Sequence, residues 1–346
     1  MTGLRKTIIA AAAAVGIGGA GAANADELYL YNWSNYIPPD LLERFEEETG
    51  IDVTLDVYDS NESMLAKLQA GATGYDIVVP SGYMVRTMIA QGIAQEINTS
   101  ELPNFGNVAA PHDSPPFDPE RKYSAPYMWG TTGLAYDTER APELEESWKE
   151  FFEPRDELKG QIVALNDPVE AWNAAAHYLG ISKCTESSDD AQKILEVLEK
   201  QKPHLAMYSS SGTIDRMVAG EVIMHHMWNG AAHRAKAKRE SISYIYPKEG
   251  LDVWGDHFVI PKGAPNVENA KTFINWMMDP KNAAEASNYT GYMNAIAGSG
   301  EYLDDSLKSD PAVNMPEEYA DRLRPLLDCS KTARELRDKV WTQLKK

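Results

Sequence analysis

Apolar and polar positions alternate with two different periods along residues 28–91. Val53, Leu55 and Val57 are separated by single polar residues, and this spacing of two predicts a strand with one buried face. The pattern predicts strands at 28–32, 51–57 and 75–79, and helices at 41–49, 61–70 and 82–91. Strands that alternate with helices through short connections are typical of a mostly parallel sheet with helices on both faces. Such sheets bind ligands at the carboxyl ends of their strands.

A second series of alternating elements follows a segment rich in proline, asparagine and aspartate. This segment, residues 98–126, predicts a long surface excursion before a strand resumes at 133–136. The later pattern predicts strands at 162–165, 222–227, 242–246 and 258–260, and helices at 168–179, 191–201, 269–278 and 332–344. We therefore expect an α/β protein with two lobes.

The N-terminal segment has the order of features typical of a secretory signal peptide. Arg5 and Lys6 precede an apolar run at 8–22, and an Ala-x-Ala cleavage site ends at Ala25. We expect residues 1–25 to be removed and the mature protein to be exported.

Charge and cysteine content narrow the range of partners. The chain of 346 residues has 33 Lys and Arg against 52 Asp and Glu, a net charge of −19. Binding to nucleic acid is not expected, because electrostatic repulsion would oppose it. The two cysteines, Cys184 and Cys329, can form a disulfide in an oxidising compartment, but their spacing alone does not establish the pairing.

The motifs of common enzymes are missing from the sequence. There is no G-x-S-x-G turn, no phosphate-binding G-x-x-x-x-G-K-S/T loop and no H-E-x-x-H helix. His225 and His226 are adjacent, so in a strand they face opposite sides and cannot bind one metal together. We expect no catalytic residue, no metal and no cofactor.

Aromatic residues recur at the ends of predicted strands and the starts of loops, several of them beside a carboxylate. They are Trp33, Tyr36, Tyr83, Trp228, Trp254 and Tyr292. Each one alone is more often a packing residue than a ligand contact. Together they fall where a doubly wound sheet places its ligand crevice.

Two acids at the start of a predicted helix have two interpretations. Asp167, Pro168 and Glu170 form a complete helix-start signature, and this structural role alone accounts for all three. Alternatively, both carboxylates face a cation in the cleft. Carboxylates pair with ammonium groups and aromatic faces pack against methylenes and cations, so the combination favours a diamine or polyamine ligand.

The order of these segments resembles the periplasmic spermidine/putrescine-binding proteins of ABC importers. The resemblance is carried by YNWSNYIPPDLLERFEEETG, SNESMLAKLQAG, YDIVVPSGY, YMWGTTGLAYD, MWNGAA, YPKEG and NYTGY. It implies a type II periplasmic binding protein fold, in which two doubly wound lobes are joined by a hinge. It also implies a periplasmic monomer that passes a polyamine to an inner-membrane ABC permease. On this basis we expect residues 26–134 and 257–300 to form lobe 1, and residues 135–256 and 301–346 to form lobe 2.

Carried over position by position, the resemblance implies a set of ligand-binding residues. They are Trp33, Ser34, Tyr36, Ser81, Tyr83, Asp167, Glu170, Trp228, Trp254, Asp256 and Tyr292. The chain departs from the family at Asn35 and Ala231, where spermidine-binding and putrescine-selective members respectively often carry an acid. A contact from the C-terminal region is also expected, and Asp328 is a candidate for it.

The sequence therefore predicts a receptor that captures spermidine or putrescine between its lobes. A receptor for another organic cation, such as agmatine or cadaverine, would keep the fold and change only the site. A periplasmic enzyme that acts through Asp167, Glu170 or Asp256 is an alternative of a different class, because paired carboxylates can also perform acid/base chemistry.

Overall fold

A computed structural model describes residues 26–71 and 74–346, so the predicted signal peptide lies outside the described residues. The strands are β1 (Asp26–Trp33), β2 (Ile51–Tyr58), β3 (Ile77–Val78), β4 (Ser124–Asp137), β5 (Ile162–Ala164), β6 (Leu205–Tyr208), β7 (Met224–Trp228), β8 (Ile242–Ile245), β9 (Leu251–Val259), β10 (Met293–Asn294) and β11 (Leu323–Pro325). The helices are α1 (Pro39–Thr49), α2 (Asn61–Gln69), α3 (Gly82–Ala90), α4 (Lys149–Phe152), α5 (Pro168–Leu179), α6 (Ser188–Gln201), α7 (Thr213–Ala219), α8 (Asn229–Lys238), α9 (Val267–Met277), α10 (Pro280–Thr290), α11 (Asp305–Ser309) and α12 (Lys331–Leu344).

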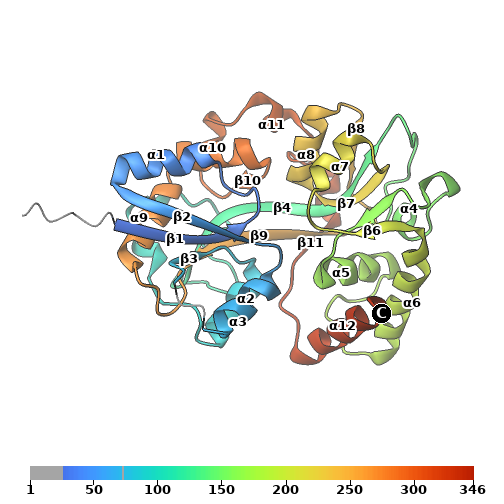
Figure 1. Cartoon of the computed structure of the whole chain (residues 1–346), viewed down its shortest axis with the longest axis horizontal. Helices are drawn as coiled ribbons and strands as arrows, with labels where there is room; N and C mark the ends of the chain where they lie inside the picture. The colour runs from blue at the N-terminus through green and yellow to red at the C-terminus, as the bar shows by residue number, and fades with distance from the viewer. Residues whose placement is uncertain (1–25, 72–73) are drawn as a thin grey trace, which may run out of the picture.

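Two parallel groups of strands are joined by an antiparallel pair. The strand order is β2-β1-β3-β9-β4-β7-β5-β6. β1 is parallel to β2 and β3, and β5 is parallel to β6 and β7, whereas β9 and β4 are antiparallel to their neighbours along this order. Figure 1 shows β4 and β9 running across the middle of the molecule from one group to the other. We call β1–β3 with α1–α3, α9 and α10 the first lobe, and β5–β8 with α4–α8 and α12 the second lobe.

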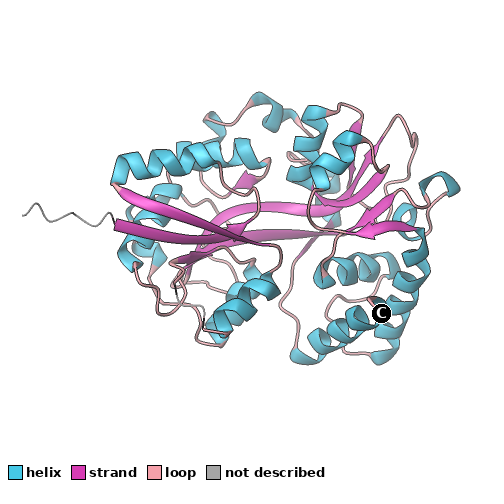
Figure 2. Cartoon of the chain, viewed as in Figure 1, coloured by secondary structure: helices cyan, strands magenta, loops and turns pink. Residues whose placement is uncertain are grey.

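Helices lie on both sides of the sheet, as the alternating pattern predicts (Figure 2). α1 begins at Pro39, a position where proline costs no hydrogen bond, and it ends at Gly50, which takes the left-handed conformation with φ of 74°. The helix buries Leu41, Leu42 and Phe45 against the sheet. The sequence pattern therefore determines the boundaries of this helix.

Each lobe has its own hydrophobic core, built from segments that are distant in sequence. In the first lobe, Leu30 and Phe45 pack in one cluster with Phe258 and Phe273. In the second lobe, a cluster that includes Trp148, Phe152 and Trp172 also contains Val340 and Leu344 from the last helix. The chain thus crosses between the lobes more than once.

Two strands extend far beyond the segments that the sequence pattern predicts. The strand predicted at 133–136 is the last part of β4, which already begins at Ser124, within the predicted surface excursion. The strand predicted at 258–260 is the end of β9, which begins at Leu251. β9 carries buried polar side chains, and their partners come from other elements, so no local hydrophobic pattern marks it.

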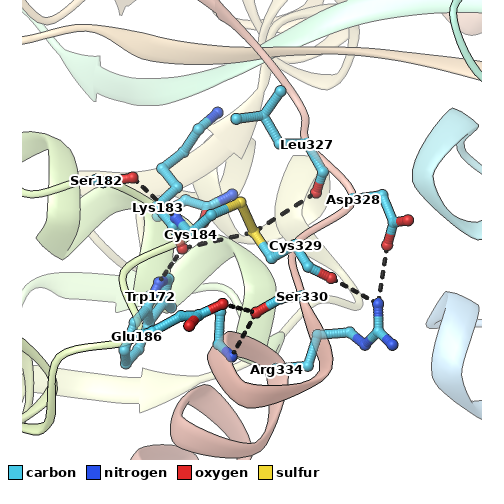
Figure 3. The surroundings of a disulfide bond; sticks show 12 residues. Trp172, Ser182, Lys183, Cys184, Glu186, Leu327, Asp328, Cys329, Ser330 and Arg334 are labelled. Carbon is cyan, nitrogen blue, oxygen red and sulfur yellow. Dashed lines mark hydrogen bonds and ion pairs between the residues drawn. A yellow bond between two sulfur atoms is a disulfide. The ribbon is translucent and has the colours of Figure 1, made fainter.

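Cys184 and Cys329 form a disulfide. It joins the loop after α5 to the segment before α12 (Figure 3). In the same segment the Arg334 guanidinium donates to the Asp328 carboxylate over 2.9 Å. Nowhere in residues 26–71 and 74–346 is a helix long and apolar enough to cross a membrane.

Candidate ligand-binding site

A cavity of about 600 Å³ lies between the lobes. The first lobe contributes the loop after β1 and the starts of α2 and α3, and the second lobe contributes the starts of α5 and α7 and one face of α8. Every residue that we predicted for ligand binding lines this cavity: Trp33, Ser34, Tyr36, Ser81, Tyr83, Asp167, Glu170, Trp228, Trp254, Asp256 and Tyr292. The structure therefore brings the whole predicted set together in one space.

Asp256 is a buried carboxylate whose hydrogen-bond donors are hydroxyl groups. It accepts hydrogen bonds from Ser81 Oγ at 2.6 Å and from Tyr36 Oη at 2.9 Å. Burial raises the pKa of Asp256 to about 7, although the two hydroxyls favour the charged form. A cation in the cavity would compensate the carboxylate more fully than hydroxyls do.

Glu170 is held in a similar way on the second lobe. Its Oε1 accepts hydrogen bonds from Thr132 Oγ1 at 2.9 Å and from Trp228 Nε1 at 3.1 Å. Burial, together with the carboxylates of Asp167 and Asp252, raises the pKa of Glu170 to about 8. The Thr132 hydroxyl also accepts a hydrogen bond from Trp254 Nε1 at 3.1 Å, so one threonine positions an acid and an indole of the site.

Asp167 both caps a helix and lines the cavity. Its Oδ1 accepts hydrogen bonds from the backbone N–H groups of Val169 at 2.7 Å and Glu170 at 3.1 Å, and Pro168 occupies the first turn. Burial raises the pKa of Asp167, while these N–H groups and the Arg337 guanidinium lower it. The helix-start interpretation is confirmed, and it leaves the second carboxylate oxygen outside the capping hydrogen bonds.

The aromatic rings of the cavity pack mainly edge to face. Tyr292 lies between Tyr36 and Trp254, with ring centroids 5.6 Å and 5.1 Å away. Gly230 lies so close to the Tyr292 ring that a side chain at this position would collide with it. The absence of a side chain at Gly230 therefore lets Tyr292 pack against the start of α8.

The prediction that these aromatic side chains lie at strand ends or loop starts is wrong for Trp254. Trp254 and Asp256 lie within β9, the strand that links the two lobes. Successive side chains of a strand point to opposite faces, so those of residues 252, 254 and 256 share one face of β9. The cavity is therefore built on the side of a strand as well as on strand ends.

Glu62 does not line the cavity, but it is a buried acid that contacts the cavity-lining Tyr83, and the sequence analysis did not single it out. It accepts a hydrogen bond from Tyr83 Oη at 3.1 Å, and its other carboxylate oxygen is buried without a partner among the described residues. Burial raises the pKa of Glu62 to about 7, and the Asp167 carboxylate adds to this shift. Its position just after a strand, in the first turn of a helix, resembles that of Glu170, and this signal could have identified it.

The C-terminal candidate, Asp328, does not line the cavity. It pairs with Arg334 at 2.9 Å and lies 3.9 Å from Arg86, so its charge is already compensated. Leu326 lines the cavity instead. The two positions noted as departures, Asn35 and Ala231, both line it as well.

Among the residues that the structure describes, no group of three or more His, Cys, Asp and Glu side chains is arranged to hold a metal ion. His225 and His226 are buried in β7, and burial lowers the pKa of His225 to about 4 and that of His226 to about 3.

Comparison with known proteins gives a consistent result. Residues 40–316 match the family described as bacterial extracellular solute-binding protein. The chain is 33% identical to the putrescine-binding periplasmic protein SpuD of Pseudomonas aeruginosa over 98% of both chains. It is 35% identical to the spermidine/putrescine-binding periplasmic protein of Salmonella typhimurium over 89% of both. A solved structure of a putative spermidine/putrescine ABC transporter from Listeria monocytogenes superposes with a TM-score of 0.87 at 31% identity, covering 92% of this chain and 99% of that one.

Proposed function

The chain belongs to the bacterial extracellular solute-binding protein family, and we propose that its ligand is a polyamine, bound in the cavity between the lobes. The observation that carries this proposal is that Asp256 and Glu170 are buried in the cavity wall with only neutral hydrogen-bond donors. A buried carboxylate without a cation is costly, and an ammonium group of the ligand would supply the missing charge.

The aromatic rings support a ligand with methylene segments between its charges. Tyr36, Trp254 and Tyr292 present ring faces and edges beside Asp256. Aromatic faces attract both methylenes and ammonium groups. The contacts that we propose are made by Trp33, Ser34, Tyr36, Ser81, Tyr83, Asp167, Glu170, Trp228, Trp254, Asp256 and Tyr292.

Closure of the lobes is the mechanism that we propose for capture. Residues 26–134 and 257–300 would form one lobe and residues 135–256 and 301–346 the other, a division supported by the separate hydrophobic cores. A ligand that touches Tyr36 and Tyr292 on one side and Glu170 on the other has its full set of contacts only when the lobes are together. Binding therefore shifts the population toward the closed form, which an ABC permease in the membrane would recognise.

We further propose that the protein is exported by residues 1–25, acts in the periplasm as a monomer and leaves its ligand chemically unchanged. The periplasmic names of the relatives support the location. An enzyme acting through Asp167, Glu170 or Asp256 would convert the ligand, so recovery of intact ligand after prolonged incubation separates the two functions.

The test is calorimetric titration of the ligand-free mature protein with putrescine, cadaverine, agmatine, spermidine and spermine. We expect binding of at least one of these amines with a stoichiometry of one. Trp254→Ala should weaken that binding by at least about tenfold, because it removes a ring that packs against the ligand. Trp276 lies outside the cavity lining, so Trp276→Ala is the matched control. Absence of binding to every amine by folded, ligand-free protein would overturn the proposal.

A further inference from the structure

One helix presents positive charge to the cavity. α8 begins directly after Trp228, and Ala231, Arg234 and Lys238 all line the cavity. Their spacing of three and four residues places them on one face of the helix. The first turn of α8 contains no acid, so the charge that this helix presents is opposite in sign to that of Asp256 on β9 and Glu170 on α5.

Arg234 differs from Lys236 and Arg239 in having no partner among the described residues, and it is more buried than the exposed Lys238. Lys236 lies 3.5 Å from Asp310, and Arg239 lies 2.5 Å from Asp137. No ion pair or hydrogen bond joins the half-buried Arg234 guanidinium to another described residue, and its Nε is buried without a partner among them. Its charge is therefore directed into the cavity without compensation.

The position of Arg234 is close to the aromatic rings. Burial raises the pKa of Tyr292, and the Arg234 guanidinium is the strongest influence that opposes this shift. Tyr292 packs against Tyr36, whose hydroxyl donates to Asp256. The positive charge of Arg234 and the negative charge of Asp256 thus both lie close enough to Tyr292 to act on its pKa, in opposite directions.

From this arrangement, and resting on the proposed function, we propose that Arg234 determines ligand specificity by repelling an additional ammonium group. Ammonium groups near Asp256 and Glu170 are compensated by carboxylates. A third ammonium that extends toward α8 meets Arg234 and the uncharged Ala231, where no acid of the helix compensates it. Specificity depends on such repulsive elements as well as on attractive ones. The site therefore selects diamines over triamines.

The experiment compares two ligands in the same protein, so that the fraction of folded protein cancels. Calorimetry gives the Kd of spermidine divided by the Kd of putrescine for the full mature chain. Arg234→Ala should lower this ratio by about fivefold, and Arg234→Glu should lower it by tenfold or more, because an attractive charge replaces a repulsive one. Arg234→Lys keeps the charge and should keep the ratio within about twofold of the wild-type value.

The matched control is Lys236→Ala, which removes a positive charge from the same helix at a position outside the cavity lining. It should leave the ratio unchanged. A ratio that stays within twofold in both Arg234→Ala and Arg234→Glu overturns the specificity role, as does an equal loss of affinity for both amines. If wild-type protein binds neither amine, the proposed function itself fails, and this outcome is distinct from binding with an unchanged ratio.

Discussion

Two aspartates on β9 are both buried, yet their surroundings differ completely. Asp252, at the second-lobe end, pairs with Lys183, lies 3.2 Å from His177 Nε2 and accepts a hydrogen bond from Asn173 at 2.6 Å. Asp256, four residues later in the cavity wall, receives only hydroxyl donors. The chain thus supplies cations for the first carboxylate and none for the second.

The pKa values follow this difference. Burial acts to raise the pKa of Asp252, but His177 and Lys183 lower it more strongly, so it lies below its usual range. Burial raises the pKa of Asp256 to about 7 because no cation opposes it. The comparison teaches that burial alone does not identify a binding residue. The informative feature is a buried charge whose natural partner is missing from the protein.

The largest expected effect is a difference in the free energy of unfolding between variants of the two aspartates. Asp252→Asn leaves the Lys183 ammonium buried without its carboxylate, so we expect the free energy of unfolding to fall by about 3 kcal/mol or more at pH 7. Asp256→Asn removes no ion pair and should change it by less than about 1 kcal/mol. Urea unfolding of the ligand-free variants measures both values. Equal losses in the two variants would remove the distinction between them.

The pH dependence of binding gives the next effect. Near pH 6 Asp256 and Glu170 are mostly protonated in the empty cavity, since their pKa values are about 7 and about 8. An ammonium ligand favours the carboxylates, so binding releases protons and the affinity should rise by about tenfold or more from pH 6 to pH 8. Calorimetry in buffers of different ionisation enthalpy counts the protons.

The control for this pH effect is Asp256→Asn, which should flatten the pH dependence of binding and weaken binding.

The pH dependence of the free energy of unfolding has opposite signs at the two aspartates. The raised pKa of Asp256 gives a stability contribution that is present below about pH 4 and is lost as the pH rises through about 7. The lowered pKa of Asp252 gives a contribution that is present above about pH 4 and is lost below it. An affinity that does not change between pH 6 and pH 8 would contradict the assignment of these acids to the ligand.

The smallest expected effect concerns Thr132, whose hydroxyl positions two side chains of the site. Thr132→Val keeps the shape of the side chain but removes the hydroxyl that donates to Glu170 and accepts from Trp254. We expect polyamine binding to weaken by about three- to tenfold, the value of a hydrogen bond of about 1 kcal/mol. Thr138→Val, on a hydroxyl that donates to the Ser241 carbonyl instead, serves as the control. Equal affinities of the two variants would assign Thr132 to the fold alone.

Local sequence signals can predict both ends of a helix correctly. The helix predicted at 168–179 is observed with these bounds, because its capping aspartate, first-turn proline and terminal Gly180 all act within the helix itself. The sequence pattern predicts only the last residues of β9. Its buried Asp252 forms an ion pair with Lys183 and its buried Asp256 accepts a hydrogen bond from Tyr36, and both contacts join segments that are distant in sequence. A period of two cannot be recognised when such polar residues occupy buried positions.

The candidate site was predicted mainly through its aromatic residues and through the family resemblance. Arg234 was missed because α8 is rich in alanine and charged residues and gave no clear helical pattern next to β7. The disulfide cannot be predicted from the sequence, because the spacing of Cys184 and Cys329 carries no information on whether the two segments meet. Both features depend on how distant segments are placed in space.

Both hydrophobic cores contain residues from the C-terminal part of the chain, and this limits when each core can form during synthesis. The first-lobe core needs Phe258 and Phe273, and the second-lobe core needs Val340 and Leu344. During synthesis the N-terminal segments emerge first and expose apolar residues such as Leu30 whose partners have not yet been made. Neither core is complete before most of the chain has been synthesised, so the full packing of both lobes can form only late in translation or after it.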